Sequence, residues 1–399
     1  MKESSSHLVR KAMDLPLLKK PLWFFLLLPF LFFLSFFVSF IASFRRNSFE
    51  LKFKAKNHSI KVICVGNVII GGTGKSPIVF TLAKEFIERG YQVAIASRGM
   101  SVKKSVVYFH AASYQMEQII TLSDENREHF EKLRSYSSQF FILQNKNRNE
   151  SYEFFQNQIL QQTKPLPAVM IMDDGLQNFT CPLDVQLCVW QPNILLFSPK
   201  FSMPVGPFRE GFGKKTFHNL IEKFDYRLWS RVKQEDWACF HSQVENALKN
   251  YGILISPKDV FIQYEIEMKN ILIEPNGFKL VDCPSSGKNE FSNASLISGI
   301  ARPEAFLNDL KSQFPLCKDW NTLCLDDHAE FQDNKAKIKS FLEKSSVCFF
   351  SWKDFFRWVD EVEFLSMLCR KTIYGCGVHI SFCDSLGNKI NLSELCVHV

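Results

Sequence analysis

Residues 65–77 read Val-Gly-Asn-Val-Ile-Ile-Gly-Gly-Thr-Gly-Lys-Ser-Pro, and this stretch decides the fold. A short apolar strand is predicted before it, at 61–65, and a helix with regularly spaced apolar residues after it, at 77–88. Glycines between a strand and a helix let backbone N–H groups point at a phosphate chain, and the helix N-terminus favours its negative charge. The sequence therefore predicts a phosphate-binding loop, even though Ile69 stands where the strict pattern has its first glycine.

The residues of this loop have different chemical roles. We expect the lysine of the Gly-Lys-Ser triplet to lie along the β- and γ-phosphates and the serine hydroxyl to be a ligand of Mg²⁺. A glycine-rich turn that binds nothing is the alternative, but it does not explain why the triplet falls at the start of a helix. ATP and Mg²⁺ are thus the predicted cofactors. The predicted nucleotide-binding residues are Gly71, Gly72, Thr73, Gly74, Lys75 and Ser76.

Predicted strands and helices alternate after the loop, which is typical of a doubly wound parallel α/β sheet. The expected elements are a strand at 92–96, a helix at 124–136, a strand at 139–143 and a helix at 150–161. An apolar strand at 167–172 then leads directly into Asp173-Asp174-Gly175. P-loop enzymes hold Mg²⁺ with carboxylates at this edge of the sheet, so Asp173 and Asp174 are predicted metal ligands. A simple acidic turn is the open alternative.

The segment from Pro21 to Phe44 contains no charged residue and is rich in Phe and Leu. At ~1.5 Å per residue, about 22 helical residues extend about 33 Å, which is enough to cross a bilayer core of about 30 Å. Basic pairs flank both ends, Lys19-Lys20 and Arg45-Arg46, so charge asymmetry gives no orientation. We predict a membrane anchor that either spans the bilayer or lies in its interface. A cleaved signal peptide is disfavoured because the run is too long and no small-residue cleavage site follows.

The net charge, the cysteine content and the length of the chain limit the possible functional classes further. The net charge of +7 is modest and the basic residues are dispersed, which argues against nucleic acid as a partner and suits an anionic membrane surface or lipid substrate. Twelve cysteines without a Cys-x-x-Cys motif predict free thiols in a reducing compartment. The seven-residue spacing of Cys369, Cys376 and Cys383 matches no zinc-ligand pattern. The length of 399 residues predicts two domains after the anchor.

Several motifs, in order along the chain, resemble those of the tetraacyldisaccharide 4′-kinases, the lipid A kinases of bacterial outer-membrane biosynthesis. The motifs that carry the resemblance are Gly66-Asn67 with 71–77, Ser97-Arg98-Gly99, Asp124-Glu125, Asp173-Asp174-Gly175-Leu176-Gln177, Pro204-Val205-Gly206-Pro207-Phe208-Arg209-Glu210, Gly299-Ile300-Ala301-Arg302-Pro303 and Asp327-His328. The chain departs from the family pattern at Met100, Ser123, Asn126 and Asn178. None of these departures removes a group that the chemistry requires.

The resemblance implies transfer of the γ-phosphoryl group of ATP to the 4′-hydroxyl of a tetraacylated glucosamine disaccharide 1-phosphate. It implies that Asp124 is the base that accepts the hydroxyl proton, with His328 as its partner, and that Lys75 neutralises charge in the transition state. Glu125, in the same acidic pair as Asp124, is a further expected metal ligand. The candidates for phosphate contacts or structural ion pairs are Arg98, Arg209 and Arg302.

The predicted organisation is an anchor at 1–46, a P-loop kinase core at 47–232 and a smaller C-terminal α/β domain at 233–399 that closes over the active site. The expected partners are the acylated disaccharide and membrane lipids. The expected location is the bacterial inner membrane, with the catalytic domains on the cytoplasmic face, where ATP is found. Two other functional classes fit the sequence less well. A GTPase-like switch needs an Asn-Lys-x-Asp motif, and Asn145-Lys146-Asn147-Arg148 lacks the Asp. A binding protein without activity is disfavoured because the polar residues of the motifs are intact.

Overall fold

The structure is a computed structural model of the chain. It describes residues 22–53, 60–69, 74–99, 106–114, 118–119, 121–163, 166–178, 180–197, 201–211, 213–232, 236–274, 277–282, 293–300, 303–315, 317, 319–326 and 329–398. The chain divides into two compact units, each built from separate segments. Unit 1 contains Met1–Ser97, Asn147–Gln263 and Ser381–Val399, and unit 2 contains Arg98–Lys146 and Tyr264–Ile380.

These limits differ from the predicted domain breaks after residues 46 and 232. The difference is largest at Arg98–Lys146, which was expected in the kinase core but belongs to unit 2. Helix α5 (Asp124–Leu133) of this segment packs against helix α12 (Trp352–Trp358), which lies far along the chain. Contacts between segments distant in sequence, rather than chain order, therefore decide which residues form each unit.

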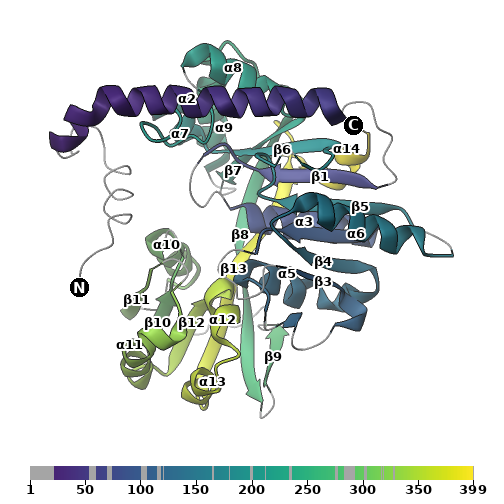
Figure 1. The fold of residues 1–399 in the computed structure, drawn as a ribbon. Coiled ribbons are helices and arrows are strands. Elements are labelled where there is room, and N and C mark those ends of the chain that lie inside the picture. Colours follow the sequence, from purple (N-terminus) through teal and green to yellow (C-terminus); the bar gives the residue numbers. More distant parts are fainter. Residues whose placement is uncertain are drawn as a thin grey trace. The chain divides into compact units, whose positions relative to one another are not determined.

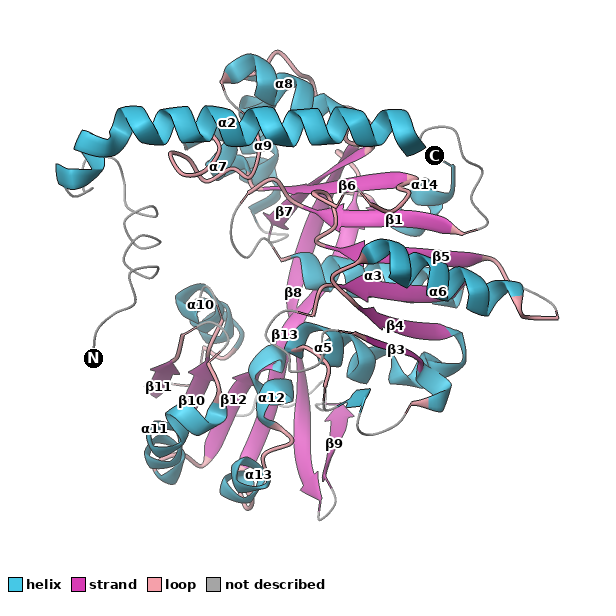
Figure 2. Cartoon of the chain, viewed as in Figure 1, coloured by secondary structure: helices cyan, strands magenta, loops and turns pink. Residues whose placement is uncertain are grey.

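A parallel sheet forms the centre of unit 1 (Figures 1 and 2). Its strands in spatial order are β8 (Asp259–Glu274), β7 (Tyr226–Val232), β6 (Val185–Trp190), β1 (Lys61–Gly66), β5 (Ala168–Asp173) and β2 (Gln92–Ser97). Each neighbouring pair in this order is parallel. Strands β1, β2 and β5 are buried almost throughout, which explains their runs of apolar residues, because parallel strands are covered on both faces. The predicted doubly wound core is confirmed.

The helices of unit 1 are α2 (Leu22–Phe53), α3 (Lys75–Glu88), α6 (Arg148–Leu160), α7 (Pro192–Phe197), α8 (Lys214–Lys223), α9 (Trp237–Lys249) and α14 (Leu392–His398). Helix α3 packs against β1, β2 and β5, and α6 packs against β2 and β5. The short strand β14 (Lys389–Ile390) pairs antiparallel with the end of β13 (Thr372–Cys383). The predicted strands and helices of this unit are confirmed, with ends that shift by at most two residues.

Unit 2 is a second α/β unit. Its parallel strands in spatial order are β11 (Asp319–Cys324), β10 (Asn293–Ser298), β12 (Val347–Ser351) and β13. Its antiparallel pairs are β8 with β9 (Gly277–Asp282) and β3 (Val107–His110) with β4 (Phe140–Gln144). Its helices are α5, α10 (Pro303–Gln313), α11 (Phe331–Glu343), α12 and α13 (Val362–Leu368), with 3₁₀ turns at Ala111–Ser113 and Arg134–Gln139.

One predicted helix of unit 2 is shorter than expected. The expected helix at 124–136 ends as an α-helix at Leu133 and continues as a 3₁₀ helix. Tyr136 has φ −104° and ψ 26°, which lie outside the helical range. The predicted strand at 139–143 is present as β4, and it pairs antiparallel with β3.

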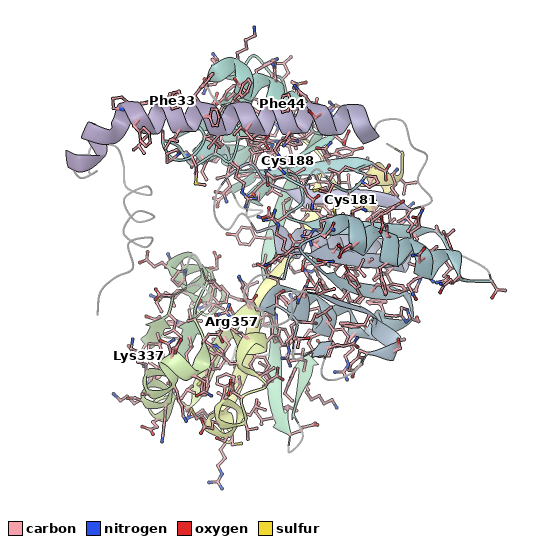
Figure 3. All side chains as sticks on the ribbon, viewed as in Figure 1. Phe33, Phe44, Cys181, Cys188, Lys337 and Arg357 are labelled. Carbon is pink, nitrogen blue, oxygen red and sulfur yellow. The ribbon has the colours of Figure 1, made fainter. Side chains whose placement is uncertain are left out.

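Helix α2 contains the predicted anchor and lies along the rest of unit 1 (Figure 1). Its part Pro29–Ser48 is long and apolar enough to cross a membrane, and only 17% of that stretch is buried. One stripe of the helix, Ser35, Ser39 and Arg46, is buried against the protein. The exposed apolar side chains, of which Figure 3 labels Phe33 and Phe44, are Phe30, Phe33, Phe36, Phe37, Val38, Phe40, Ile41 and Phe44.

The cysteines in the described part of the chain are all free thiols, as predicted. Burial raises the pKa of the Cys181 thiol to about 12, and burial raises the pKa of Cys188 well above its ordinary value (Figure 3). Because the thiolate is the reactive form, these core cysteines are chemically inert. Of the three cysteines spaced by seven residues, Cys369 is exposed while Cys376 and Cys383 are buried.

Candidate active site

The end of the phosphate loop and the start of α3 are described, whereas residues 71–73 lie outside the described part of the chain. Gly74 has φ 76°, a left-handed conformation that favours glycine, and it is the N-cap of α3. Lys75 is therefore the first residue of the helix. Its Nζ lies 3.4 Å from the side-chain oxygen of Asn67 and 3.4 Å from Asp174 Oδ1. The Lys75 ammonium group of the phosphate loop thus lies next to Asp174 of the Asp-Asp-Gly motif.

The Asp-Asp-Gly motif lies at the carboxyl end of β5, next to the carboxyl end of β1. Asp173 is in register with Val65, and the Asp174 N–H donates to the Val65 carbonyl at 2.9 Å. Asp174 has φ 53°, so the chain turns sharply after the strand in a conformation that aspartate tolerates better than most residues. The predicted position of both carboxylates beside the phosphate loop is confirmed, and their role in metal binding stays a prediction.

Arg209 forms a bidentate ion pair with Asp174. Its Nη1 donates to Asp174 Oδ1 at 2.9 Å, and its Nη2 donates to Oδ2 at 3.1 Å. Burial opposes ionisation of Asp174, but Lys75 and Arg209 outweigh that effect and lower the pKa of the carboxyl below its ordinary value. Of the other two candidate arginines, Arg98 is exposed and Arg302 lies outside the described residues.

Ser76, Asp173 and Asp174 offer the hard oxygen ligands that Mg²⁺ prefers. No group of three or more His, Cys, Asp or Glu side chains in the described part of the chain is arranged to hold a metal ion. A nucleotide-bound Mg²⁺ needs only one or two protein carboxylates, because phosphates and waters supply its other ligands. Both Asp174 oxygens already accept hydrogen bonds from Arg209, so we expect Asp173 to be the main carboxylate ligand. The Ser76 hydroxyl and the Asp173 carboxylate are therefore suitable ligands for a Mg²⁺ ion that also binds phosphates and waters.

Asp124, the predicted base, is the first residue of α5 in unit 2. Its Oδ2 accepts a hydrogen bond from Arg357 Nη2 at 2.6 Å, and both side chains are less than a tenth exposed (Figure 3 labels Arg357). Lys353 Nζ lies 3.9 Å from the same oxygen and 3.5 Å from Glu125 Oε1. Glu125, a predicted metal ligand, therefore has a lysine partner here. The two cations and the helix N-terminus all favour the ionised form of Asp124.

Asp354 holds Arg357 in its position. Arg357 Nη1 donates to Asp354 Oδ1 at 3.0 Å, and Asp354 Oδ2 accepts from the Gly299 N–H at 2.9 Å and from the Ser351 hydroxyl at 2.5 Å. Asp354 is completely buried, and this burial raises the pKa of its carboxyl although Arg357 opposes the rise. The guanidinium of Arg357 is thus fixed on one side by Asp354 and binds Asp124 with the other.

Two departures from the family pattern support the start of α5. Ser123 is the N-cap, and its hydroxyl accepts from the Asn126 N–H at 3.4 Å. Gln144 Oε1 accepts from the Ser123 N–H at 2.9 Å and from Asn126 Nδ2 at 2.8 Å. These substitutions therefore preserve the turn that carries Asp124.

His328, the predicted partner of Asp124, lies outside the described residues, so the dyad stays a prediction. The residue that follows it, Ala329, is described. Its carbonyl accepts from Trp358 Nε1 at 3.0 Å and from Arg357 Nη1 at 3.5 Å. Arg357 therefore contacts both Asp124 and the residue next to His328 in the chain.

Sequence reasoning missed Lys353, Asp354 and Arg357. A local signal was present, because Ser351 and Asp354 have the spacing of a helix cap, directly after an apolar strand. The Ser351 hydroxyl accepts from the Asp354 N–H at 3.1 Å, and the helix carries Asp354 and Arg357 as an i, i+3 ion pair. Such a cap indicates the start of a helix but gives no information on its packing against α5.

Comparison with known proteins agrees with these observations. A model of the tetraacyldisaccharide-1-P 4′-kinase family matches residues 27–390 of the chain. The tetraacyldisaccharide 4′-kinase of Francisella tularensis subsp. novicida (strain U112) is 29% identical over 274 residues, which cover 68% of this chain and 73% of that protein. The enzyme of the same name from Ruthia magnifica is 32% identical over 161 residues, or 40% of this chain and 46% of that protein.

The solved structures give the same result for the fold. The crystal structure of LpxK from Aquifex aeolicus in complex with ATP matches with a TM-score of 0.60 and 18% sequence identity, over 93% of this chain and 98% of that chain. At this identity the match shows a shared fold. Because the family model covers nearly the whole sequence, this chain belongs to the tetraacyldisaccharide-1-P 4′-kinase family.

Proposed function

We propose that this chain transfers the γ-phosphoryl group of ATP to the 4′-hydroxyl of a tetraacylated glucosamine disaccharide 1-phosphate, a step of lipid A synthesis. The observation that carries the proposal is the cluster of Lys75, Asp174 and Arg209 at the end of a phosphate loop, in a chain of this family. Lys75 offers a cation for the phosphates, and the carboxylates at the end of β5 offer ligands for the metal ion that accompanies them.

Phosphoryl transfer needs charge neutralisation more than covalent chemistry from the protein. In this structure the Lys75 ammonium is paired with Asp174. The β- and γ-phosphates carry more negative charge, so Lys75 binds them when the nucleotide enters, while Arg209 keeps Asp174 paired. Mg²⁺, held by Ser76 and Asp173, would supply further neutralisation of the phosphate oxygens.

Asp124 is the proposed base. The 4′-oxygen bonds to the γ-phosphorus, the bond from that phosphorus to the β–γ bridging oxygen breaks, ADP leaves with the electron pair, and Asp124 takes the hydroxyl proton. The ion pair with Arg357 keeps the carboxylate oriented before the reaction. His328 is its proposed partner, as the resemblance to the family implies.

Activity is expected to require Mg²⁺, and Asp173→Asn is expected to lower kcat by ~10²-fold or more, because the ion loses its charged protein ligand. Asp225→Asn is the matched control. Asp225 Oδ2 accepts a hydrogen bond from the Gln186 N–H at 2.7 Å, and the side-chain oxygen of asparagine can accept the same bond. The kcat of this variant should therefore stay within about twofold of that of the unaltered chain. Turnover is measured against Mg²⁺ concentration. Activity that persists in excess chelator contradicts the role given to Asp173.

Helix α2 is proposed to lie in the membrane interface rather than to cross the bilayer. Ser35 donates to the Ser202 carbonyl at 2.5 Å, and Arg46 donates to Glu210 Oε2 at 3.1 Å. The helix between these two contacts extends about 16 Å, roughly half of a bilayer core, so a crossing helix would carry buried polar contacts of unit 1 into hydrocarbon. The exposed aromatic face suits the depth of the head groups, with the units on the cytoplasmic face.

Replacing Phe33, Phe37 and Phe44 by serine is expected to release most of the protein from lipid vesicles, even at high salt. Burying each such side chain contributes about 1.5 to 3 kcal/mol, and none of the three belongs to the buried stripe of α2. The control replaces Val362 and Leu386, which are 80% and 81% exposed on other elements. Cosedimentation measures the bound fraction. If the triple variant stays bound, the aromatic face is not the attachment surface.

The proposed activity is tested by phosphotransfer from labelled ATP to the disaccharide 1-phosphate in mixed micelles. ATP should be consumed only when the acylated disaccharide is present, and the label should appear at its 4′ position. ATP consumption without the acceptor, or no labelled lipid at any enzyme concentration, contradicts the proposal.

A further inference from the structure

Arg46 is a buried charged residue of helix α2. It is 4% exposed, whereas Arg45, its neighbour on the same helix, is exposed. Its Nε donates to Glu210 Oε2 at 3.1 Å, its Nη2 donates to Glu210 Oε1, and Nη2 also donates to the Leu176 carbonyl at 3.4 Å. The guanidinium faces into unit 1, so it does not serve as a contact for lipid head groups. A buried charge is tolerated only when it is paired, which Glu210 achieves for Arg46.

Two of the partners of Arg46, Glu210 and Leu176, lie in motifs of the phosphate site, while its Nη1 also donates to Gln186 Oε1 at 3.5 Å. Leu176 follows the Asp-Asp-Gly turn, and it lies so close to the end of β1 that a Cβ on Gly66 would be 2.6 Å from its Cγ. Glu210 follows Arg209 directly in the chain. The backbone N–H of Arg209 donates to the Val68 carbonyl at 2.7 Å, which ties this segment to the loop after β1.

Gln177 continues the connection toward the nucleotide site. Its Nε2 donates to the Asn67 carbonyl at 3.0 Å and lies 3.5 Å from Glu210 Oε1, and its Oε1 accepts from Arg209 Nη1 at 2.8 Å. Arg209 holds Asp174, whose carboxylate lies 3.4 Å from Lys75 Nζ. A continuous series of polar contacts thus runs from the membrane helix to the phosphate-binding lysine.

We propose that Arg46 is a positioning residue, through which the docking of α2 on unit 1 sets the nucleotide site. The proposal rests on the role given above to Lys75. Without Arg46, Glu210 is a buried carboxylate in need of a new cation, and Arg209 contacts the same Gln177 side chain as Glu210. Asp174 loses each hydrogen bond that Arg209 donates to Glu210 instead. The Asp174 carboxylate then binds the Lys75 ammonium more tightly and competes with the nucleotide phosphates for it. The membrane helix therefore contributes to ATP affinity as well as to attachment.

The test uses the full chain on lipid vesicles and compares Arg46→Gln with the adjacent exposed control Arg45→Gln. Arg46→Gln is expected to weaken binding of a non-hydrolysable ATP analogue about ten- to hundredfold, as expected for the loss of hydrogen bonds to a charged group. Its vesicle binding should not change, because the exposed aromatic face is intact. Arg46→Lys, which keeps the charge, should recover most of the affinity, and Arg45→Gln should bind the analogue like the unaltered chain.

Three outcomes overturn the proposal: unchanged ATP-analogue affinity in Arg46→Gln, an equal loss in Arg45→Gln, or a loss that parallels a loss of vesicle binding. If Arg46→Gln does not fold, the double variant Arg46→Gln with Glu210→Gln removes both buried charges. That variant should fold and bind the analogue within about threefold of the unaltered chain, since no unpaired Glu210 carboxylate then competes with Asp174 for Arg209. A loss of affinity of about tenfold or more in it overturns the proposal, because such a loss cannot come from competition between Glu210 and Asp174 for Arg209. Failure of the unaltered chain to bind the analogue contradicts the proposed function instead.

Discussion

Replacing Lys75 with alanine is expected to lower kcat by ~10²-fold or more while the protein still folds. The ammonium group contacts oxygens of Asn67 and Asp174, and in the proposed reaction it contacts phosphate oxygens whose charge increases in the transition state. Its loss leaves no unpaired buried charge, because Arg209 still binds both oxygens of Asp174. The effect should therefore fall on catalysis rather than on stability.

Lys84→Ala is the matched control for this prediction. Lys84 lies on the same helix, its side chain is 41% exposed, and its only recorded ion pair in the described part of the chain is with Glu88 one turn away. Such surface pairs contribute about 1 kcal/mol or less, so activity should stay within about twofold. Single-turnover phosphotransfer at saturating ATP separates the two variants. Near-normal turnover in Lys75→Ala contradicts the assignment of the phosphate loop.

The core of the fold was predictable because its signals are local. The runs at 61–65, 92–96 and 167–172 are apolar at nearly every position, which is characteristic of buried parallel strands, and all three are strands of the sheet. The Gly-Lys-Ser triplet predicted the strand-to-helix turn from a few adjacent residues. The composition of the two units was not predictable in this way, because residues 98–146 join unit 2 through packing against helices late in the chain.

The candidate site shows the same division between local and distant information. Lys75, Asp173 and Asp174 were found from motifs of a few residues, and the structure places them together at one edge of the sheet. Arg46 and Arg357 were not found, because their partners Glu210 and Asp124 are 164 and 233 positions away in the sequence. No periodicity or spacing connects residues at such distances. Only the folded chain shows that helices α2 and α12 each supply an arginine to these carboxylates.

Asp124→Asn is expected to lower kcat by ~10² to 10⁴-fold with little change in ATP affinity, because asparagine cannot accept the hydroxyl proton. The side chain keeps its shape and can still accept from Arg357 through its carbonyl oxygen, so the start of α5 should be preserved. Glu128→Gln is the matched control, one turn along the same helix, where Glu128 pairs with Lys132 at 2.9 Å. That variant should keep nearly full activity, because glutamine keeps the shape of the side chain and Lys132 still has Glu267 3.9 Å away.

Combining Asp124→Asn with His328→Ala tests whether the two residues act as a unit. His328→Ala alone is expected to cost less than Asp124→Asn, since Arg357 still orients the carboxylate at 2.6 Å when the imidazole is absent. The double variant should be no slower than Asp124→Asn, because a partner has nothing to assist once the base is gone, and losses within one catalytic unit are not additive. The measurement is kcat for the four proteins of the cycle. Multiplicative losses would mean that His328 acts independently of Asp124, and the proposed dyad would then be wrong.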